Sequence, residues 1–462
     1  MSRAEPAVAL VGAGPTGALL SILLRRRGYR VVVYDGRPDP RRHPQESGRS
    51  INLALAARGI RALERVGIYA RLRDAMVPMH GRFVHGSDGS TSLQRYGTRP
   101  GEMLRAISRA ELGRALIEIA DGEYGVDLRF EHRLEGADFC TGLASIRDLR
   151  TATRVEVPMR PLIACDGAGS AMRRCLRDAR LLESRQVELD HGYKELSIPA
   201  GAHGAPLPGR EALHIWPRGG HMLIALPNTD GSFTATLFLP RRGSPSFESL
   251  SDDGAIAQFF ETDFADVTGC MPRLAAEFRD RPVGSLGTVW AAPWHHRDMV
   301  ALVGDSAHAI VPFHGQGMNC CFEDCLAFDE CVARHGDWEA RFAAFFALRK
   351  PNTDAIAAMS LDNYAEMRAK VADPGFRLQN ELAHELERRL PERFVPRYSM
   401  VMFHDEIPYA LAERRGRIQA SLLAELTAGA ARLADIDLDG ARRAVEKRLT
   451  PIAQDLSSVT NV

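Results

Sequence analysis

A glycine-rich turn between an apolar strand and an apolar helix constrains the fold of this 462-residue chain most strongly. Val8 to Val11 lead into Gly12-x-Gly14-x-x-Gly17, and a mostly apolar segment that reads as a helix follows from Ala18 to Arg27. Gly12 permits a tight turn, Gly14 lets a pyrophosphate approach the backbone, and Gly17 lets helix and strand pack closely. The helix N-terminus favours phosphate charge. The segment predicts a dinucleotide-binding βαβ unit, although a turn that binds nothing can have the same spacing.

A second strand and an acidic residue complete this unit. Tyr29 to Tyr34 read as a strand, and Asp35 follows it. An acidic side chain at this place accepts hydrogen bonds from ribose hydroxyls. This unit by itself is compatible with NAD as well as with FAD.

Two further strand-end motifs favour FAD. Arg160 to Cys165 read as a strand that ends in Asp166-Gly167, and Met299 to Val303 read as a strand that ends in Gly304-Asp305. Ligands of open α/β sheets bind at the carboxyl ends of strands. Each aspartate alone is also a common turn residue, so the argument rests on the three motifs in this order. Together they predict a chain wrapped around FAD.

A glycine-rich loop after the third motif leads into an apolar helix from about Cys320. Its sequence is Pro312-Phe313-His314-Gly315-Gln316-Gly317-Met318-Asn319. Such a loop offers backbone N–H groups and the positive end of a helix dipole. Because a reduced isoalloxazine ring gains negative charge near N1 and O2, this loop would stabilise it.

With these residues, the chain resembles the class A flavoprotein aromatic hydroxylases, the group of p-hydroxybenzoate hydroxylase, and within it the kynurenine 3-monooxygenase family. The resemblance runs from about residue 6 to about residue 410. It is specific, because several matching segments lie outside the cofactor motifs that such flavoproteins share. These segments are Gly48–Leu55, Met79–Gly81, His191–Leu196, Leu213–Arg218, Met222–Asn228 and Ala309–Phe313.

The expected fold class is α/β, with a Rossmann-type FAD-binding domain, an inserted antiparallel β-sheet substrate domain and a C-terminal helical region. Strand-like alternation over residues 213–239 supports the sheet, and a helical pattern runs from Asp354 onward. The expected boundaries are 1–75, 100–180 and 295–350 for the FAD-binding domain, 76–99 and 181–294 for the sheet domain, and 351–462 for the helical region.

The motifs and the resemblance together define an expected cofactor site. NADPH is the expected co-substrate and NADH remains open, because the sequence has no second nucleotide-binding motif and the family has no dedicated one. The expected FAD-binding residues are Gly12, Ala13, Gly14, Pro15, Thr16, Gly17, Asp35, Arg37, Ala54, Arg109, Leu134, Asp166, Asp305, Gly317, Met318 and Asn319.

A predicted β-hairpin places a cation near a phenol. Arg82 to His85 and Thr91 to Tyr96 read as strands joined by a Gly- and Ser-containing turn, so Arg82 and Tyr96 should lie roughly opposite each other. A guanidinium can bind both oxygens of a carboxylate. The resemblance assigns these two residues to the substrate's carboxylate, and a surface arginine stacked on a tyrosine is the alternative.

A polar residue interrupts an apolar helix face further along the chain. Ile356, Met359, Asn363 and Met367 have helical spacing. The Asn363 amide needs partners if it is buried, and either a substrate or the backbone could supply them. The resemblance adds Tyr398 to the pocket, and His314 departs from the family, which has a second Phe there. The expected lining of the ring cavity is Leu213, Ile224, Phe238, Pro312, Phe313 and His314.

The resemblance implies a monooxygenase that uses FAD, NAD(P)H and O2 to hydroxylate L-kynurenine at ring C3, giving 3-hydroxy-L-kynurenine. Reduced flavin and O2 would form a C4a-hydroperoxide, while the protein supplies placement and a dry pocket. Because the ring amine already activates the ortho carbon, no catalytic acid or base is expected.

Three other functions share parts of this pattern. A hydroxylase of another anthraniloyl-like or phenolic acid would keep the fold and differ near Phe238 or His314. An FAD-dependent halogenase or dehydrogenase is a second alternative, although the Trp-rich signature of the halogenases is missing from the sequence. A non-catalytic flavin-binding protein is the third, and NADPH consumption would exclude it.

Composition argues against several other classes of protein. With 59 basic and 59 acidic residues, the chain lacks the bulk charge of a nucleic-acid binder. No apolar run reaches the roughly 18 residues of a membrane span, and residues 411–462 are too charged for the C-terminal anchor of some family members. We therefore expect a soluble, cytoplasmic enzyme, whose C-terminal residues serve either packing or a homodimer.

The eight cysteines are expected to be free thiols. Cys320, Cys321, Cys325 and Cys331 cluster on the helix after the glycine-rich loop, but their spacing is wrong for zinc. Core packing is therefore the expected role, and no metal is expected. Free thiols also fit a reducing cytoplasm.

Overall fold

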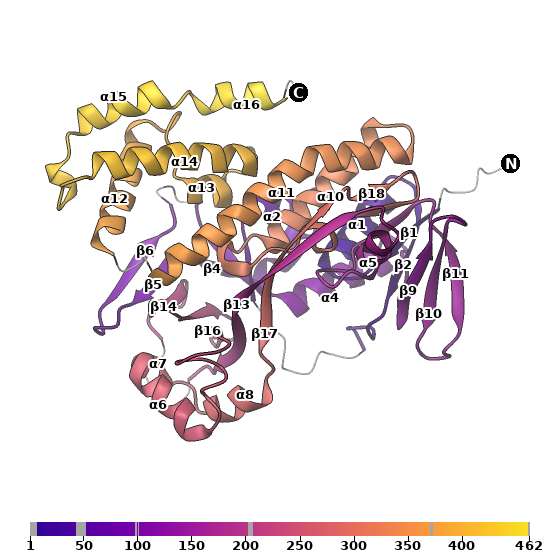
Figure 1. The fold of residues 1–462 in the computed structure, drawn as a ribbon, viewed down its shortest axis with the longest axis horizontal. Helices are drawn as coiled ribbons and strands as arrows, with labels where there is room; N and C mark the ends of the chain where they lie inside the picture. Colours follow the sequence, from indigo (N-terminus) through magenta and orange to yellow (C-terminus); the bar gives the residue numbers. More distant parts are fainter. Residues whose placement is uncertain are drawn as a thin grey trace. The chain divides into compact units, whose positions relative to one another are not determined.

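The computed structural model describes residues 7–42, 52–97, 99, 101–201, 207–369 and 373–460 (Figure 1). The chain divides into two compact units, each assembled from three stretches of sequence. The residues of the expected C-terminal helical region from Ala358 onward belong to the same unit as most of the large antiparallel sheet. Unit 1 is Met1–Met76, Ile107–Leu189 and Ser285–Ala357, and unit 2 is Val77–Ala106, Asp190–Gly284 and Ala358–Val462.

Unit 1 is built on a six-stranded sheet in the order β18-β19-β12-β1-β2-β8, parallel except for the edge strand β18. Its central strands are short apolar runs buried on both faces, as parallel strands between helices require. This confirms the α/β fold class. The strands are β1 (Ala7–Val11), β2 (Arg30–Asp35), β8 (Asp127–Phe130), β12 (Leu162–Ala164), β18 (His295–His296) and β19 (Val300–Leu302).

The helices of unit 1 follow from caps and apolar faces. Helix α1 (Pro15–Arg26) begins with a proline, whose missing N–H costs no hydrogen bond at a first position. Ser108 and Ser170 cap α4 and α5 through their side chains. The other elements of unit 1 are α2 (Ala57–Arg65), α3 (Tyr69–Leu72), α4 (Arg109–Gly122), α5 (Ala171–Asp178), α9 (Asp305–His308), α10 (Gly317–Arg334), the 3₁₀ helices η1 (Arg73–Ala75) and η2 (Pro312–His314), and the strands β3 (Asn52–Leu55), β9 (His132–Asp138), β10 (Leu143–Asp148) and β11 (Arg154–Pro158).

Unit 2 contains an antiparallel sheet in the order β13-β16-β15-β14-β5-β6, in which only the pair β14 and β5 is parallel. One face packs on three helices through an aromatic-rich core. The elements are β4 (Val77–Met79), β5 (Gly81–His85), β6 (Thr91–Arg95), β14 (Leu213–Pro217), β15 (Met222–Pro227), β16 (Phe233–Pro240), α6 (Asp253–Asp263), α7 (Ala265–Thr268) and α8 (Leu274–Asp280). Strands β7 (Leu104–Ser108) and β13 (Glu183–Ile198) each include residues of both units, and β17 (Gly284–Ala292), the neighbour of β13 in the sheet, belongs to unit 1 from Ser285 onward.

Unit 2 also contains the C-terminal helices, drawn in orange and yellow in Figure 1. Leu382, Leu386, Phe394, Leu422 and Val445 form their buried core. In the described ranges, no helix combines the length and the apolar character needed to cross a bilayer. The helices are α11 (Trp338–Ala369), which begins in unit 1, α12 (Pro374–Arg389), α13 (Arg397–Phe403), α14 (Tyr409–Leu426), η3 (Leu433–Asp435), α15 (Leu438–Arg448) and α16 (Ile452–Thr460).

Candidate functional site

The three sequence motifs meet at one edge of the unit 1 sheet. Strands β19, β12, β1 and β2 are parallel neighbours, so their carboxyl ends lie side by side. The backbone ladder continues past the strands, since Cys165 N donates to Val11 O at 2.7 Å and Val303 N donates to Ala164 O at 3.0 Å. Ligands of open α/β sheets bind at this edge.

Close contacts show which glycines serve the fold. Gly12 has a φ of +99°, and a Cβ there would lie 2.4 Å from the Cys165 carbonyl oxygen. A Cβ on Gly17 would lie 1.9 Å from the Gly12 carbonyl oxygen. At Gly14, the nearest described atom is Arg37 Nη2, at 4.0 Å. The space beside Gly14 is therefore open, as a phosphate approaching the first amides of α1 requires.

Asp35 holds the glycine turn against β2. Its carboxylate accepts from Ala13 N at 2.7 Å and from Arg37 N, Nε and Nη2 at 2.8, 3.0 and 2.7 Å. Burial favours a raised pKa for Asp35, but the hydrogen bonds from Arg37 and Ala13 outweigh it, so the pKa is lowered. Because these four donors fill its lone pairs, a contact with a ribose hydroxyl requires the Arg37 side chain to move.

Asp166 has one satisfied oxygen and one orphaned oxygen. Its Oδ2 accepts from Ala171 N at 2.7 Å and from Met172 N at 3.2 Å, which caps α5. Its Oδ1 is buried without a hydrogen-bond partner among the described residues. Burial raises the pKa of this carboxyl group. An orphaned buried oxygen indicates a missing donor, which a bound ligand can supply.

The third motif is packed against the first. A Cβ on Gly304 would lie 3.0 Å from Thr16 Cγ2 and 3.1 Å from Cys321 Sγ. The Cys321 thiol donates to Asp305 Oδ1 at 3.4 Å. Ser306 Oγ donates to Ala164 O at 2.7 Å and so ties the ends of β19 and β12 together. These contacts hold Asp305, which is half-buried, beside the glycine turn.

The glycine-rich loop is organised by Asn319. This fully buried amide donates to Ala54 O and Gly315 O and accepts from Ala56 N, each at 2.9 Å. The side chain of Asn319 therefore positions Ala54 and the loop. The first turn of α10 has no acidic residue, and its leading amides have no intrahelical acceptor. A partial positive charge therefore develops at Gly317 and Met318.

Two of the expected cofactor residues show contrasting environments. Leu134 on β9 is buried in the core of unit 1. Arg109 is the first residue of α4, directly after the Ser108 cap, and its side chain is exposed. The exposure of Arg109 leaves it accessible to an anionic ligand.

The predicted substrate residues of unit 2 share one face of its sheet. The register pairs Arg82 with Leu213 and with Gln94. Because side chains alternate between the two faces, Tyr96 lies on the Arg82 face, diagonally across the hairpin rather than directly opposite. Ile224 pairs with Ile215 and with Thr236, which places Ile224 and Phe238 on this face too. The opposite face packs on α6, α7 and α8.

Arg82, Tyr96 and Tyr398 form a cluster. The Arg82 guanidinium carbon lies 4.5 Å from the centre of the Tyr398 ring and 5.8 Å from that of Tyr96, and the two rings stack at 5.7 Å. Arg82 Nε and the Tyr96 hydroxyl are buried without a partner in hydrogen-bond geometry among the described residues. Burial raises the pKa of Tyr96 well above its ordinary value, so the hydroxyl stays protonated and can donate.

Asn363 lies on α11, close to the helix that carries Tyr398. Arg397 donates to Glu366 at 3.0 Å and to Asp362 at 3.4 Å, so α13 is tied to α11 on either side of Asn363. The Asn363 side chain is 5% exposed, and Ile356 and Met359 on the same helix are fully buried. Three residues of the predicted face, Ile356, Met359 and Asn363, are therefore buried as expected, and the side chain of the fourth, Met367, lies outside the described residues.

The remaining predicted lining residues belong to unit 1. Pro312, Phe313 and His314 form η2, directly before the glycine-rich loop. Phe313 and His314 are buried. The loop that the sequence assigned to the flavin ring therefore also carries these three residues.

Comparisons with known proteins identify the family of the chain. Residues 5–203 match the family of FAD binding domains. The chain is 46% identical to a kynurenine 3-monooxygenase of Stenotrophomonas maltophilia, over 95% of this chain and 96% of that protein. It is 42% identical to the kynurenine 3-monooxygenase of Myxococcus xanthus, over 98% of both proteins.

The chain belongs to the kynurenine 3-monooxygenase family. Solved structures support the fold. The 2-methyl-3-hydroxypyridine-5-carboxylic acid oxygenase has a TM-score of 0.65 at 20% identity, over 83% of this chain and 98% of that one. Pseudomonas aeruginosa PqsL has a TM-score of 0.64 at 22% identity, over 79% of this chain and 97% of that one.

The residues of unit 1 fit FAD, the cofactor of this family. The open space at Gly14 suits a pyrophosphate, the orphaned Oδ1 of Asp166 can accept from a cofactor hydroxyl, and the amides at Gly317 can face a reduced ring. The three sequence motifs predicted FAD as the cofactor, and this prediction is confirmed.

Sequence reasoning missed two buried charged residues near these sites. Arg173 on α5 donates to the Ser306 carbonyl at 2.6 Å and also bonds the Ala168 carbonyl, so it joins the second and third motifs. Glu195 is buried on β13, and its pairing with Thr236 puts it on the Arg82 face of the sheet. In both cases the sequence offers one signal, which is a charged residue at a position where the periodicity of the helix or strand predicts burial.

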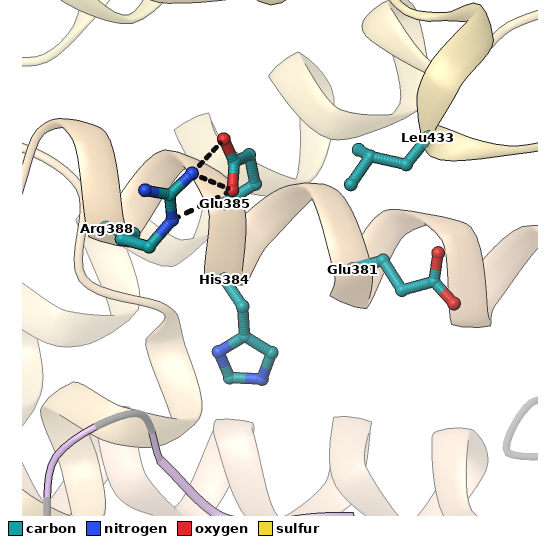
Figure 2. A pocket seen from close by; sticks show the side chains of 5 residues that line it. All are labelled: Glu381, His384, Glu385, Arg388 and Leu433. Carbon is teal, nitrogen blue, oxygen red and sulfur yellow. Dashed lines mark hydrogen bonds and ion pairs between the residues drawn. The ribbon is translucent and has the colours of Figure 1, made fainter.

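One surface pocket of the described residues is formed by other side chains. It has a volume of about 450 Å³ and is lined by Glu381, His384, Glu385, Arg388 and Leu433 (Figure 2). Glu385 is already paired with Arg388 and Arg389. None of the predicted site residues lines it.

The clustered cysteines of α10 are buried in the protein interior. Cys320, Cys321, Cys325 and Cys331 are all buried, and burial raises the pKa of each thiol. Cys325 Sγ donates to Thr16 O at 3.4 Å. Packing against the glycine turn therefore accounts for this residue.

Proposed function

We propose that this protein hydroxylates L-kynurenine at ring C3, using NADPH and O2, and releases 3-hydroxy-L-kynurenine. The near full-length relatives named kynurenine 3-monooxygenase support this substrate. Within this chain, the main support for this substrate is a buried cluster in unit 2. It consists of Arg82, Tyr96 and Tyr398.

The cluster suits the amino-acid end of kynurenine. Arg82 provides a fixed positive charge, and Tyr96 provides a neutral hydroxyl donor. Charge-assisted hydrogen bonds to a carboxylate are roughly twice as strong as neutral ones. The Tyr398 ring beneath the guanidinium fixes its plane, and the Asn363 amide is the proposed contact for the rest of the amino-acid group.

The aromatic ring would lie against the apolar part of the same sheet face. Leu213, Ile224 and Phe238 offer hydrocarbon surface there. Bound FAD supplies the activation of O2, and this chain's residues place the ring and exclude water. Orientation alone can supply much of the rate enhancement. Because the ring amine activates the carbon next to it, we assign no side chain as catalytic acid or base.

Kynurenine-dependent turnover tests the proposal. The purified holoenzyme should oxidise NADPH faster with L-kynurenine than without it, and 3-hydroxy-L-kynurenine should appear in equal amount. NADPH oxidation that yields peroxide but no hydroxylated product would mean that kynurenine is only an effector. In that case another anthraniloyl-like or phenolic acid is the substrate, and product analysis with such acids identifies it. A parallel assay with NADH decides the reductant.

A further inference from the structure

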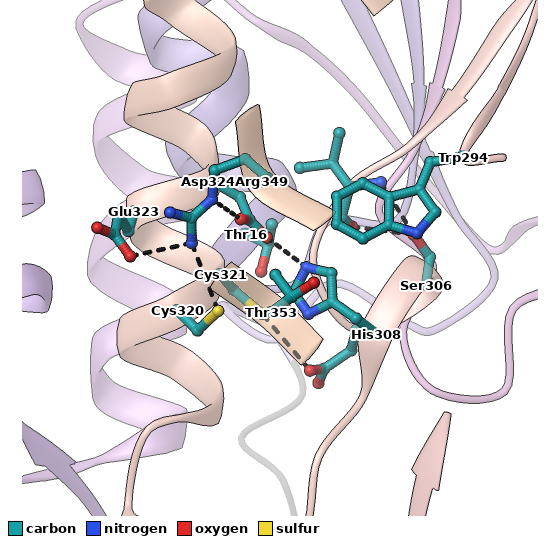
Figure 3. A network of polar contacts seen from close by, with 12 residues as sticks. Thr16, Trp294, Ser306, His308, Cys320, Cys321, Glu323, Asp324, Arg349 and Thr353 are labelled. Carbon is teal, nitrogen blue, oxygen red and sulfur yellow. Dashed lines mark hydrogen bonds and ion pairs between the residues drawn. The ribbon is translucent and has the colours of Figure 1, made fainter. Parts of the chain in front are cut away.

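A buried charge network joins the third motif to the helix after the glycine-rich loop (Figure 3). Asp324 on α10 lies at its centre, and His308 and Arg349 bond its two oxygens. His308 Nε2 lies 2.6 Å from Asp324 Oδ2, and Arg349 Nε donates to Asp324 Oδ1 at 2.6 Å. Asp324 is 0% exposed, and His308 and Arg349 are each 4% exposed.

The charge of Asp324 is balanced within the network. Arg349 Nη2 also lies 2.9 Å from Glu323 Oε2 and 3.5 Å from Cys320 Sγ, and Arg58 lies 3.4 Å from Glu323. Burial favours a raised pKa for Asp324, but the charges of His308 and Arg349 outweigh it and lower the pKa. The lowered pKa favours the ionised carboxylate, although its side chain is fully buried.

The two elements that Asp324 joins both contribute predicted FAD residues. His308 ends α9, which begins at Asp305. Asp324 lies seven residues after Gly317, or about 10 Å along α10 from its N-terminus. Trp294 packs on the His308 ring, with centroids 5.0 Å apart, and so limits its rotation. The His308–Asp324 contact thus ties the end of α9 to α10, in addition to the Cys321–Asp305 contact near their beginnings.

A metal site is the competing interpretation of this cluster. His308, Cys320 and Asp324 offer three ligand atoms within 4.8 Å of one another. However, Arg349 already occupies one Asp324 oxygen and contacts the Cys320 sulfur. Burial also raises the pKa of Cys320 well above its ordinary value, which disfavours the thiolate that a metal needs. A cation in this space would have to displace the guanidinium.

We propose that Asp324 and His308 are positioning residues for FAD, which fix α9 against α10 and set the charge behind the α10 N-terminus. This proposal depends on the proposed function only because both require the protein to bind FAD. A chain that binds FAD but does not hydroxylate kynurenine would overturn the substrate and leave this inference intact.

The test compares FAD affinity and flavin midpoint potential in matched variants. His308→Ala should weaken FAD binding to the apoprotein about tenfold, the effect of one lost charged hydrogen bond, whereas His308→Gln, which can still donate to Asp324, should stay near wild type. Asp324→Asn should shift the midpoint potential of bound FAD to a more positive value, because the network then carries one negative charge fewer and so favours reduced flavin. Flavin fluorescence and redox titration give both quantities.

Asp329→Asn is the control. Asp329 also lies on α10, and its ion pair among the described residues is with Arg27, at 2.5 Å. This variant should lose stability without a change in midpoint potential or FAD affinity. The proposal is overturned if His308→Ala and His308→Gln bind FAD alike, or if Asp324→Asn and Asp329→Asn have the same midpoint potential. If Asp324→Asn does not fold, the comparison of the two His308 variants decides.

Discussion

The guanidinium carbon of Arg82 lies 4.5 Å from the centre of the Tyr398 ring, which joins a strand of the unit 2 sheet to helix α13. A cation over an aromatic face is attracted by the ring quadrupole, by about 2 kcal/mol where water is excluded. The contact holds the guanidinium in one orientation while its Nε remains without a hydrogen-bond partner among the described residues. This arrangement would preorganise the site for an anion.

Replacement of Arg82 should separate substrate binding from cofactor binding. Arg82→Ala should raise the KM for L-kynurenine by about 10- to 100-fold, because a charged hydrogen bond contributes about 1.5–3 kcal/mol. Arg82→Lys should recover only part of this, since an ammonium lacks the planar fork. FAD content, read from absorbance, should match wild type. An unchanged KM in Arg82→Ala would remove the carboxylate assignment.

Loss of the Tyr398 hydroxyl and loss of its ring should raise the KM for kynurenine by different amounts. Tyr398→Phe keeps the face under Arg82, so the KM for kynurenine should rise less than about tenfold, as for one neutral hydrogen bond. Tyr398→Leu also loses the cation–π contact and should raise the KM further. Steady-state kinetics of the two variants give the contrast. Equal values of KM would show that the ring does not orient Arg82.

Gly14 and Gly12 distinguish a binding turn from a structural one. Gly14→Ala introduces no close contact within the protein, so the variant should fold normally and bind FAD weakly. Gly12→Ala requires a positive φ and a contact of 2.4 Å with Cys165, so it should destabilise the fold by about 1–3 kcal/mol or more. Thermal unfolding of the apoprotein and FAD titration measure the two effects. A Gly14→Ala protein with wild-type FAD affinity would indicate that no phosphate lies there.

Glu195 provides a test of the proposal that no side-chain base is needed. It is the buried carboxylate on the same sheet face as Phe238 and Ile224. Glu195→Gln should keep kcat within a few-fold of wild type, whereas loss of a general base costs about 10²–10⁴-fold. Single-turnover hydroxylation at saturating kynurenine measures this step. A loss of kcat as large as that expected for a general base would make Glu195 a catalytic residue.

His214 should make stability depend on pH. Burial lowers its pKa to about 4, and its Nδ1 lies 2.9 Å from His85 Nε2. Because the folded pKa lies below the unfolded value of about 6.5, the unfolded chain binds more protons between these pH values. The contribution of this group is therefore complete above about pH 6.5 and is lost as the pH falls toward 4, by about 2 kcal/mol at pH 5.

Urea unfolding of His214→Asn at pH 7.5 and pH 5 checks this dependence. An Asn amide can either donate to His85 or accept from it but does not titrate, so the free energy of unfolding of His214→Asn should fall less between the two pH values than that of wild type. An identical fall in both proteins would assign the acid sensitivity to other groups.

Much of the fold could be predicted from the sequence because its signals are local. The turn at Gly12, the strand before Asp166 and the strand before Gly304 are each contained within a few residues, and each appears as expected. The sequence signal for the hairpin that carries Arg82 was also local. Its register was approximate, since Tyr96 lies diagonal to Arg82, and a hairpin register depends on turn geometry that spacing alone does not define.

The binding residues could be predicted less completely than the fold, because their hydrogen-bond partners are distant in the sequence. Asp35 was expected to meet a ribose, yet Ala13 N and Arg37 fill its lone pairs. Asn319 was expected at the cofactor and stays a prediction, and its side chain bonds Ala54 O and Gly315 O. Such satisfied polar groups are invisible to motif reading, since a hydrogen bond is decided by where the backbone of another segment lies.

The sequence by itself determined the strands, the glycine turns, the FAD class of ligand and the family, because each depends on local backbone preference or on a contiguous match. Only the tertiary structure decided that Arg82 stacks on Tyr398, that Asp166 keeps an orphaned oxygen, and that Asp324 meets His308. These are contacts between segments far apart in the chain. Their geometry is set by the packing of whole helices and sheets, in which a carboxylate can be buried only where its counter-charges are buried with it.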